Sequence, residues 1–161
     1  MRVVATMLSF CIVLPASAAL LVSTPAEVCS LLNDQGLATR GWKNSDGLGF
    51  FCSSPYKEFG PGFPLANNLA FYAEGTRNAV GKVKLVLNVN NRDSSSAAHE
   101  ELLQAANALS LEVMGEQLPN VLKDAIKNGS NASQKIGSSV VDVVKENWPA
   151  DKGYEVKVII K

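Results

Sequence analysis

The chain has 161 residues, among them 15 basic and 15 acidic side chains, one histidine and three cysteines. This balance of charge argues against nucleic acid as a partner, because binding to phosphates needs a clear surplus of basic side chains. The length is sufficient for one domain with a substantial hydrophobic core. We therefore expect a single domain that binds no nucleic acid.

The amino-terminal segment has the order of a cleavable secretory signal. A basic residue stands near the amino terminus, an apolar run covers residues 3–14, and small side chains follow. The run is too short to span a bilayer as a helix, but it suits a signal peptide. We predict a signal peptide over residues 1–18, cleaved after Ala18 or, as the second choice, after Ala19. The remaining domain, residues 19–161, is expected to be periplasmic or secreted and to have no membrane span.

Two cysteines, Cys29 and Cys52, remain after cleavage at that site. Exported proteins meet oxidising conditions, under which an even pair of cysteines is typically bridged. We predict a disulfide between them, which would stabilise the fold by about 3 kcal/mol through the loop it closes. Two separate buried thiols are the alternative.

The first half of the domain predicts one helix and three strands. Thr24 and Glu27 have the spacing of a capping box, Pro25 suits the first helical position, and Gly36 suits the end of the helix. Short apolar segments bounded by turn residues predict strands that pair in antiparallel order. These segments are residues 47–54, 68–75 and 82–90.

The second half predicts helices and a final strand. Helical spacing of apolar residues predicts one helix from Ser94 to Gly115 and another over residues 119–128. The polar segment 129–139 predicts a loop. The valine-rich segment 136–147 fits a helix by its spacing, although valine also favours strands, and we interpret it as a helix. Strict alternation over residues 154–161 predicts a last strand.

Together these elements predict a single α+β domain. We expect an antiparallel sheet of about four strands, three of them consecutive plus the C-terminal strand, with helices packed on one face and one disulfide. If the last strand lies at a sheet edge, its backbone could accept a strand from a partner, or Lys157 and Lys161 could prevent such pairing.

The sequence offers little for catalysis. The single histidine, His99, lies at the start of the longest predicted helix, and we expect it to be solvated there. No spacing of metal ligands or of a nucleophile with its base is present, so we predict no catalytic residue, no metal site and no cofactor. Carboxylate pairs such as Asp46 with Glu58, or Asp142 with Glu146, keep an exported hydrolase open as an alternative.

The segment "SPYKEFGPGFP" is the most unusual part of the chain. Its prolines and glycines exclude a helix and predict an ordered loop, and seven of the ten aromatic residues that remain after signal removal lie between Phe50 and Tyr72. In one interpretation Phe59 and Phe63 cover the sheet edge. In the other, Tyr56 and Phe59 point outward on the stiff loop and bind a partner, with Trp42 nearby. The candidate binding residues are Trp42, Tyr56, Phe59 and Phe63.

We therefore expect a small exported, disulfide-stapled, non-enzymatic module that binds another protein in the periplasm or outside the cell. An inhibitor or an immunity-type protein is the role that fits these features. The alternatives are the hydrolase above and a carrier of a small molecule or lipid. A carrier would need an enclosed apolar cavity beneath the aromatic segment.

Overall fold

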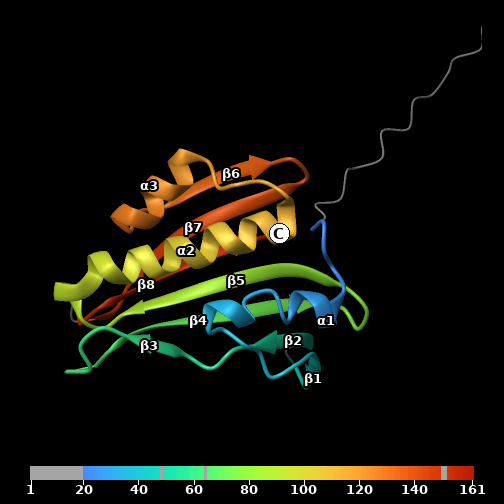
Figure 1. The fold of residues 1–161 in the computed structure, drawn as a ribbon, viewed down its shortest axis with the longest axis horizontal. Coiled ribbons are helices and arrows are strands. Elements are labelled where there is room, and N and C mark those ends of the chain that lie inside the picture. The colour runs from blue at the N-terminus through green and yellow to red at the C-terminus, as the bar shows by residue number, and fades with distance from the viewer. Residues whose placement is uncertain (1–19, 48, 64, 150–151) are drawn as a thin grey trace, which may run out of the picture.

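The computed structural model describes residues 20–47, 49–63, 65–149 and 152–161, and the predicted signal lies outside these ranges. Within them the chain forms one antiparallel sheet of eight strands, with three α-helices on one of its faces (Figure 1). The strands are β1 (Lys43–Ser45), β2 (Gly49–Ser53), β3 (Lys57–Phe59), β4 (Asn67–Gly75), β5 (Val80–Val89), β6 (Ala132–Ile136), β7 (Ser139–Asn147) and β8 (Tyr154–Ile160). Their order across the sheet is β1-β2-β4-β5-β8-β7-β6, and β3 also pairs with β4.

The two longer helices end where the sequence predicts, whereas the first helix is shorter than predicted. They are α1 (Pro25–Val28), α2 (Ser95–Met114) and α3 (Asn120–Asn128). α2 and α3 were predicted, and each ends at a glycine with positive φ, Gly115 (70°) and Gly129 (56°). The predicted first helix is only one turn of α-helix, followed by a short 3-10 helix at Asn33–Gln35.

The expected sheet of about four strands is wrong, because the structure has eight. The largest difference lies in the segment interpreted as a polar loop and a helix, which forms the hairpin β6–β7. Val141 and Val143 point into the core and are 0% and 1% exposed, whereas Val140 and Val144 point to the other face and are half-buried. This alternation has the two-residue period of a strand, for which β-branched side chains are well suited.

The position of the last strand also differs from the one considered. β8 lies inside the sheet, between β5 and β7, so its backbone is paired on both sides. Lys157 forms ion pairs with Glu146 (2.9 Å) on β7 and with Glu155 (2.6 Å) on its own strand. Its role is therefore cross-strand pairing on the open face and not protection of an edge.

The core lies between the sheet and α2. One side of the long strands β4, β5 and β8 supplies buried side chains, with Phe71, Leu85 and Val158 at 0% exposure. The stripe predicted on α2 packs against them, and Leu102 and Leu109 are fully buried. Among the described residues, no helix is both long enough and apolar enough to cross a membrane.

The predicted disulfide is present. Cys29, directly after α1, is bonded to Cys52 on β2, with 6.1 Å between the Cα atoms. Both cysteines are buried against the core. The bond therefore holds the short α1 segment, which has few helical hydrogen bonds of its own, onto the sheet.

Replacing both cysteines by serine is expected to lower the free energy of unfolding by about 3 kcal/mol, because the unfolded chain regains the entropy of an open loop. Denaturant unfolding of the oxidised protein and of the variant measures the difference. Reductant should weaken the wild type and leave the variant unchanged. Equal denaturation midpoints for the two proteins would contradict the prediction.

A matched pair of substitutions tests the strand character of β7. Val143→Thr is expected to cost about 1–2 kcal/mol of stability, because it places a hydroxyl in the core. Val144→Thr, one residue on and on the open face, is expected to cost less than about 0.5 kcal/mol. Thermal or denaturant unfolding gives both values, and equal losses would be inconsistent with alternation along this segment.

Candidate functional site

The structure separates the four predicted binding residues into two groups. Trp42 lies beside Phe50, whose strand position pairs with Gly75 at one end of β4. Phe59 pairs with Asn67 at the other end of β4. With a rise of about 3.3 Å per residue, the two ends of this strand are roughly 25 Å apart. The chain therefore presents two candidate surfaces, one at each end of the sheet.

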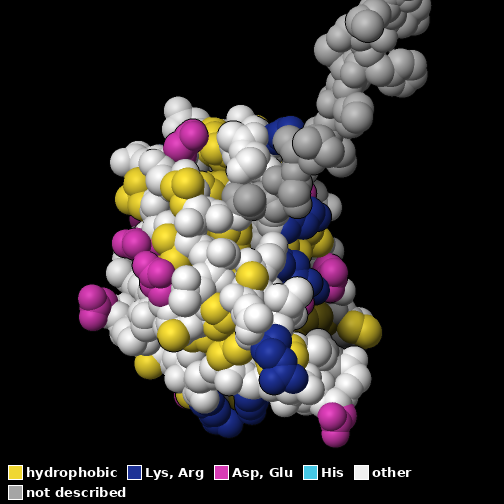
Figure 2. All heavy atoms as spheres, turned by 90° about the vertical axis from the view of Figure 1, so that its right-hand side faces the viewer, with side chains coloured by type: hydrophobic (Ala, Val, Ile, Leu, Met, Phe, Trp, Pro, Cys, Tyr) yellow, Lys and Arg dark blue, Asp and Glu magenta, His cyan; other side chains and the backbone are white. Residues whose placement is uncertain are grey.

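The end that carries α1 and the β4–β5 turn has a mixed surface. Figure 2 faces this end and shows hydrophobic side chains in small groups among polar atoms. Basic side chains lie mainly in the right-hand part of that view, and most of the acidic ones lie along its left margin. This end therefore resembles a surface for polar ligands more than a continuous apolar patch.

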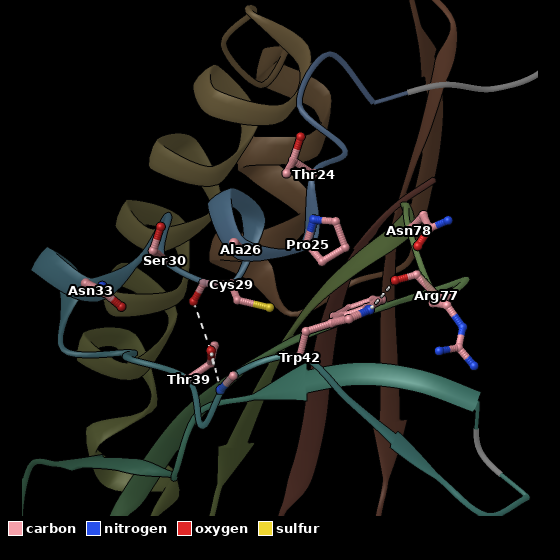
Figure 3. A pocket seen from close by; sticks show the side chains of 11 residues that line it. Thr24, Pro25, Ala26, Cys29, Ser30, Asn33, Thr39, Trp42, Arg77 and Asn78 are labelled. Atoms are coloured by element: carbon pink, nitrogen blue, oxygen red, sulfur yellow. Dashed lines mark hydrogen bonds between the residues drawn. The ribbon is translucent and has the colours of Figure 1, made fainter.

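An open groove lies at this end, between α1 and the loop that carries Trp42 (Figure 3). Its volume is about 670 Å³. The groove is bounded by α1, by the segment that leads into β1 and by the β4–β5 turn. The lining residues are Thr24, Pro25, Ala26, Cys29, Ser30, Asn33, Thr39, Gly41, Trp42, Arg77 and Asn78.

Trp42 is held in place within the groove. Its indole Nε1 donates a hydrogen bond to the carbonyl oxygen of Arg77 (3.2 Å), and its ring stacks on that of Phe50 with 6.4 Å between the centroids. The guanidinium of Arg77 lies over the same Phe50 ring at 5.3 Å. Gly75 permits the tight turn, since a Cβ there would lie 2.1 Å from the carbonyl oxygen of Ala79. Trp42 and Arg77 therefore share one rigid support.

The opposite wall of the groove is tied to the disulfide. Thr39 Oγ1 donates a hydrogen bond to the carbonyl oxygen of Cys29 (3.0 Å) and accepts one from the backbone N–H of Gly41 (3.3 Å). The loop that leads to Trp42 is thus fastened to the residue that the disulfide fixes. The groove depends on this covalent link for its shape.

The aromatic loop forms the second surface and divides the two interpretations of its phenylalanines. Phe59 is half-buried in β3 and packs against the core, so it covers the sheet edge. Phe63 points outward and is 88% exposed, with Leu65 at 64% and Tyr56 at 53%. The expectation that Phe59 points outward is therefore wrong, and so is the expectation that Phe63 covers the sheet edge, since Phe59 packs on the core and Phe63 is exposed.

Three asparagines hold the backbone of this loop. The side-chain amides of Asn91 and Asn90 donate to the carbonyl oxygens of Phe63 (3.4 Å) and Ala66 (2.6 Å). Asn67 bonds the backbone of Asn91 in both directions, donating to its carbonyl oxygen (3.1 Å) and accepting from its N–H (2.8 Å). These hydrogen bonds fasten Phe63 and Ala66 to the segment that follows β5. Sequence reasoning missed this role, although the asparagines that follow β5 were a visible signal.

Trp148, which was not among the predicted binding residues, lies at the same end of the molecule. A second hollow, of about 450 Å³, is lined by Leu65, Asn90, Trp148 and Lys152. These residues come from three connections that gather at the left end of the sheet in Figure 1. Their separation along the chain left no local signal that they would meet.

Tyr56 is linked to the open face of the sheet through Tyr72. The hydroxyl of Tyr72 donates a hydrogen bond to that of Tyr56 (3.3 Å), and Lys84 Nζ lies 4.9 Å from the centre of the Tyr72 ring. Burial raises the pKa of Tyr72 above its ordinary value of 10.0, and the hydrogen bond with Tyr56 raises it further. Tyr72 therefore stays neutral over a wide range of pH.

The substitution Tyr56→Phe is expected to lower the pKa of Tyr72, because it removes the hydrogen bond that favours the neutral phenol. Ultraviolet absorbance of tyrosinate during a pH titration measures this pKa. The variant Tyr72→Phe shows which phase of the titration curve belongs to Tyr72. The contribution of Tyr72 to the free energy of unfolding should be fully present below pH 10.0 and should fall above it, because the phenol ionises at lower pH in the unfolded chain than in the folded one. A wild-type titration without a late phase would contradict this assignment.

His99 is buried, so the expectation that it is solvated is wrong. Its Nδ1 lies 2.8 Å from the carbonyl oxygen of Lys127, and its Nε2 lies 2.9 Å from the hydroxyl of Tyr154. Because a carbonyl oxygen only accepts, Nδ1 carries the proton and Nε2 accepts from Tyr154. A Cβ at Gly129 would lie 2.7 Å from His99 Cε1, so glycine is required there. The pair joins α2, α3 and β8 and has a structural role.

The carboxylate pairs do not form a shared cleft. Asp142 and Glu146 lie four residues apart on β7, a separation of roughly 13 Å along a strand. The Lys161 ammonium (2.7 Å) and the hydroxyl of Ser133 lower the pKa of Asp142. Asp46 follows β1, whereas Glu58 lies in β3, at opposite ends of β4. The described residues also contain no group of three or more side chains able to hold a metal ion.

Comparison with known proteins places the chain in a family. Residues 12–149 match the model of a family of unknown function, DUF6030. The chain belongs to this family. No curated protein and no solved structure matches it.

Proposed function

We propose that this DUF6030 protein is an exported, non-enzymatic module that binds another protein through its aromatic loop, as an inhibitor or immunity-type protein does. The observation that carries the proposal is the exposure of Phe63, which is 88% accessible on a loop whose backbone is already held. Leu65 and Tyr56, on either side of Phe63 in the chain, are exposed as well, and Trp148 lies beside Leu65. We call the residues Tyr56, Phe63, Leu65 and Trp148 the aromatic end.

Preorganisation of the loop favours binding energetically. Ordering a loop on binding costs conformational entropy, and a loop that its own hydrogen bonds already fix avoids most of that cost. Large side chains on such a loop then contribute their buried apolar area directly, as the central residues of protein interfaces do. The partner suited to this surface is a protein with an apolar pocket that receives Phe63.

The disulfide supports export, because such bonds persist in oxidising compartments. The hydrolase alternative draws no support from the groove, since the described residues that line it include no carboxylate. The carrier alternative draws no support from the aromatic segment, because Phe59 packs directly against the core where a carrier would need an apolar cavity. Protein binding remains the function that the exposed residues favour.

The double variant Phe63→Ala/Leu65→Ala tests the proposal. Both side chains are exposed, so the fold should be retained, while affinity for the partner should fall by at least about 30-fold through loss of the central apolar contacts. The partner is first recovered by affinity purification from extract of the oxidising compartment, and its affinity is then measured with purified proteins.

Leu111→Ala is the matched control. Leu111 is an exposed leucine (47%) on α2, away from the loop, and its replacement should leave affinity unchanged. A partner that binds wild type, control and double variant equally would remove the aromatic end from the interface. Thermal unfolding of each variant shows whether the fold is intact.

A further inference from the structure

We propose that the groove beside Trp42 is a second binding site, for a saccharide that carries a carboxylate. This proposal goes beyond the protein-binding function proposed above. The groove lies at the opposite end of the sheet from the aromatic end, so the two binding sites can be tested separately. The groove combines an aromatic surface, a set of free polar groups and one positive charge without an ion pair among the described residues.

Trp42 supplies the aromatic surface. Its hydrogen bond to Arg77 and its stacking on Phe50 hold the indole in one orientation, so a ligand meets a rigid plane. Figure 3 shows the indole lying across the groove opposite Pro25 of α1. The C–H groups on the face of a sugar ring can pack on such a plane by dispersion. The rigid ring loses little entropy when it does so.

Free polar side chains line the groove. Asn33 and Asn78 make no side-chain hydrogen bond with any other described residue, and the Thr24 hydroxyl does not cap α1. Figure 3 shows them spread around the groove. Hydroxyl groups at the edge of a sugar ring could satisfy these amides and this hydroxyl. A purely apolar ligand would exclude water from them without replacement, which is unfavourable.

Arg77 supplies the charge. Its guanidinium packs over Phe50 and makes no ion pair with any carboxylate in the described part of the chain. Figure 3 shows this side chain turned away from α1, so its charge lies at the outer rim of the groove. None of the described residues that line the groove is acidic, so no lining carboxylate compensates it. A guanidinium binds a carboxylate through two parallel hydrogen bonds. One cation suits one carboxylate better than a phosphate chain, and the volume of about 670 Å³ accepts a short oligosaccharide.

Trp42 can itself report binding. It is one of two tryptophans in the chain, so Trp148→Phe leaves it as the only one. This variant is titrated with a tetrasaccharide that contains glucuronic acid and with a neutral glucose tetrasaccharide. We expect a saturable change in fluorescence, with about tenfold tighter binding of the acidic probe because of its carboxylate. Acetate at the same concentration should produce no saturable change.

Arg77→Gln in this background should abolish the preference for the acidic probe while keeping weak binding of the neutral one. Lys43→Gln is the matched control, because Lys43 is a cation at the same end that lies over Phe51 and outside the groove. It should change either affinity by less than about twofold. The inference is overturned if neither tetrasaccharide binds saturably, if acetate reproduces the response, or if the preference survives Arg77→Gln. None of these outcomes depends on capture of a protein partner.

Discussion

The pairing of β5 with β8 is the contact on which the rest of the structure depends. It joins strands far apart in the chain, in a register from Val83 with Ile160 to Val89 with Tyr154. Through it, β1–β5 and β6–β8 become one sheet, and α2 and α3, which lie between them in the chain, cover its apolar side. Separate hairpins of this size would bury too little apolar surface to be stable.

The same antiparallel arrangement determines where ligands can bind. Strands that alternate in direction place their connections at the two ends of the sheet, and the groove and the aromatic end occupy these two places (Figure 1). Each is an irregular segment that needs its own support. The disulfide of Cys29 supports the groove, and hydrogen bonds from the side-chain amides of Asn90 and Asn91 support the aromatic end. The rigid sheet keeps the two surfaces apart.

Local signals were reliable where one physical effect dominated. The apolar stripe of α2, the glycine ends of α2 and α3 and the alternation of β5 all describe the observed elements. The valines of β7 led to a wrong prediction of a helix, because over so short a segment their spacing fits both the helical and the strand period. Only the pairing of β7 with β8 on one side and with β6 on the other selects the strand. The short strands β1 and β3 carry almost no periodic signal, so the size of the sheet could not be predicted.

The sequence by itself determined the disulfide partners, the long helix, the principal strands and the aromatic character of the loop after β2. These follow from residue type and from spacing between near neighbours, which the chain displays directly. Only the tertiary structure decided that Phe59 is covered while Phe63 is exposed, that His99 is buried against Tyr154, and that Trp42 belongs to a different surface from the aromatic loop. The physical reason is that burial depends on which distant segments pack together, and neither composition nor local period contains that information.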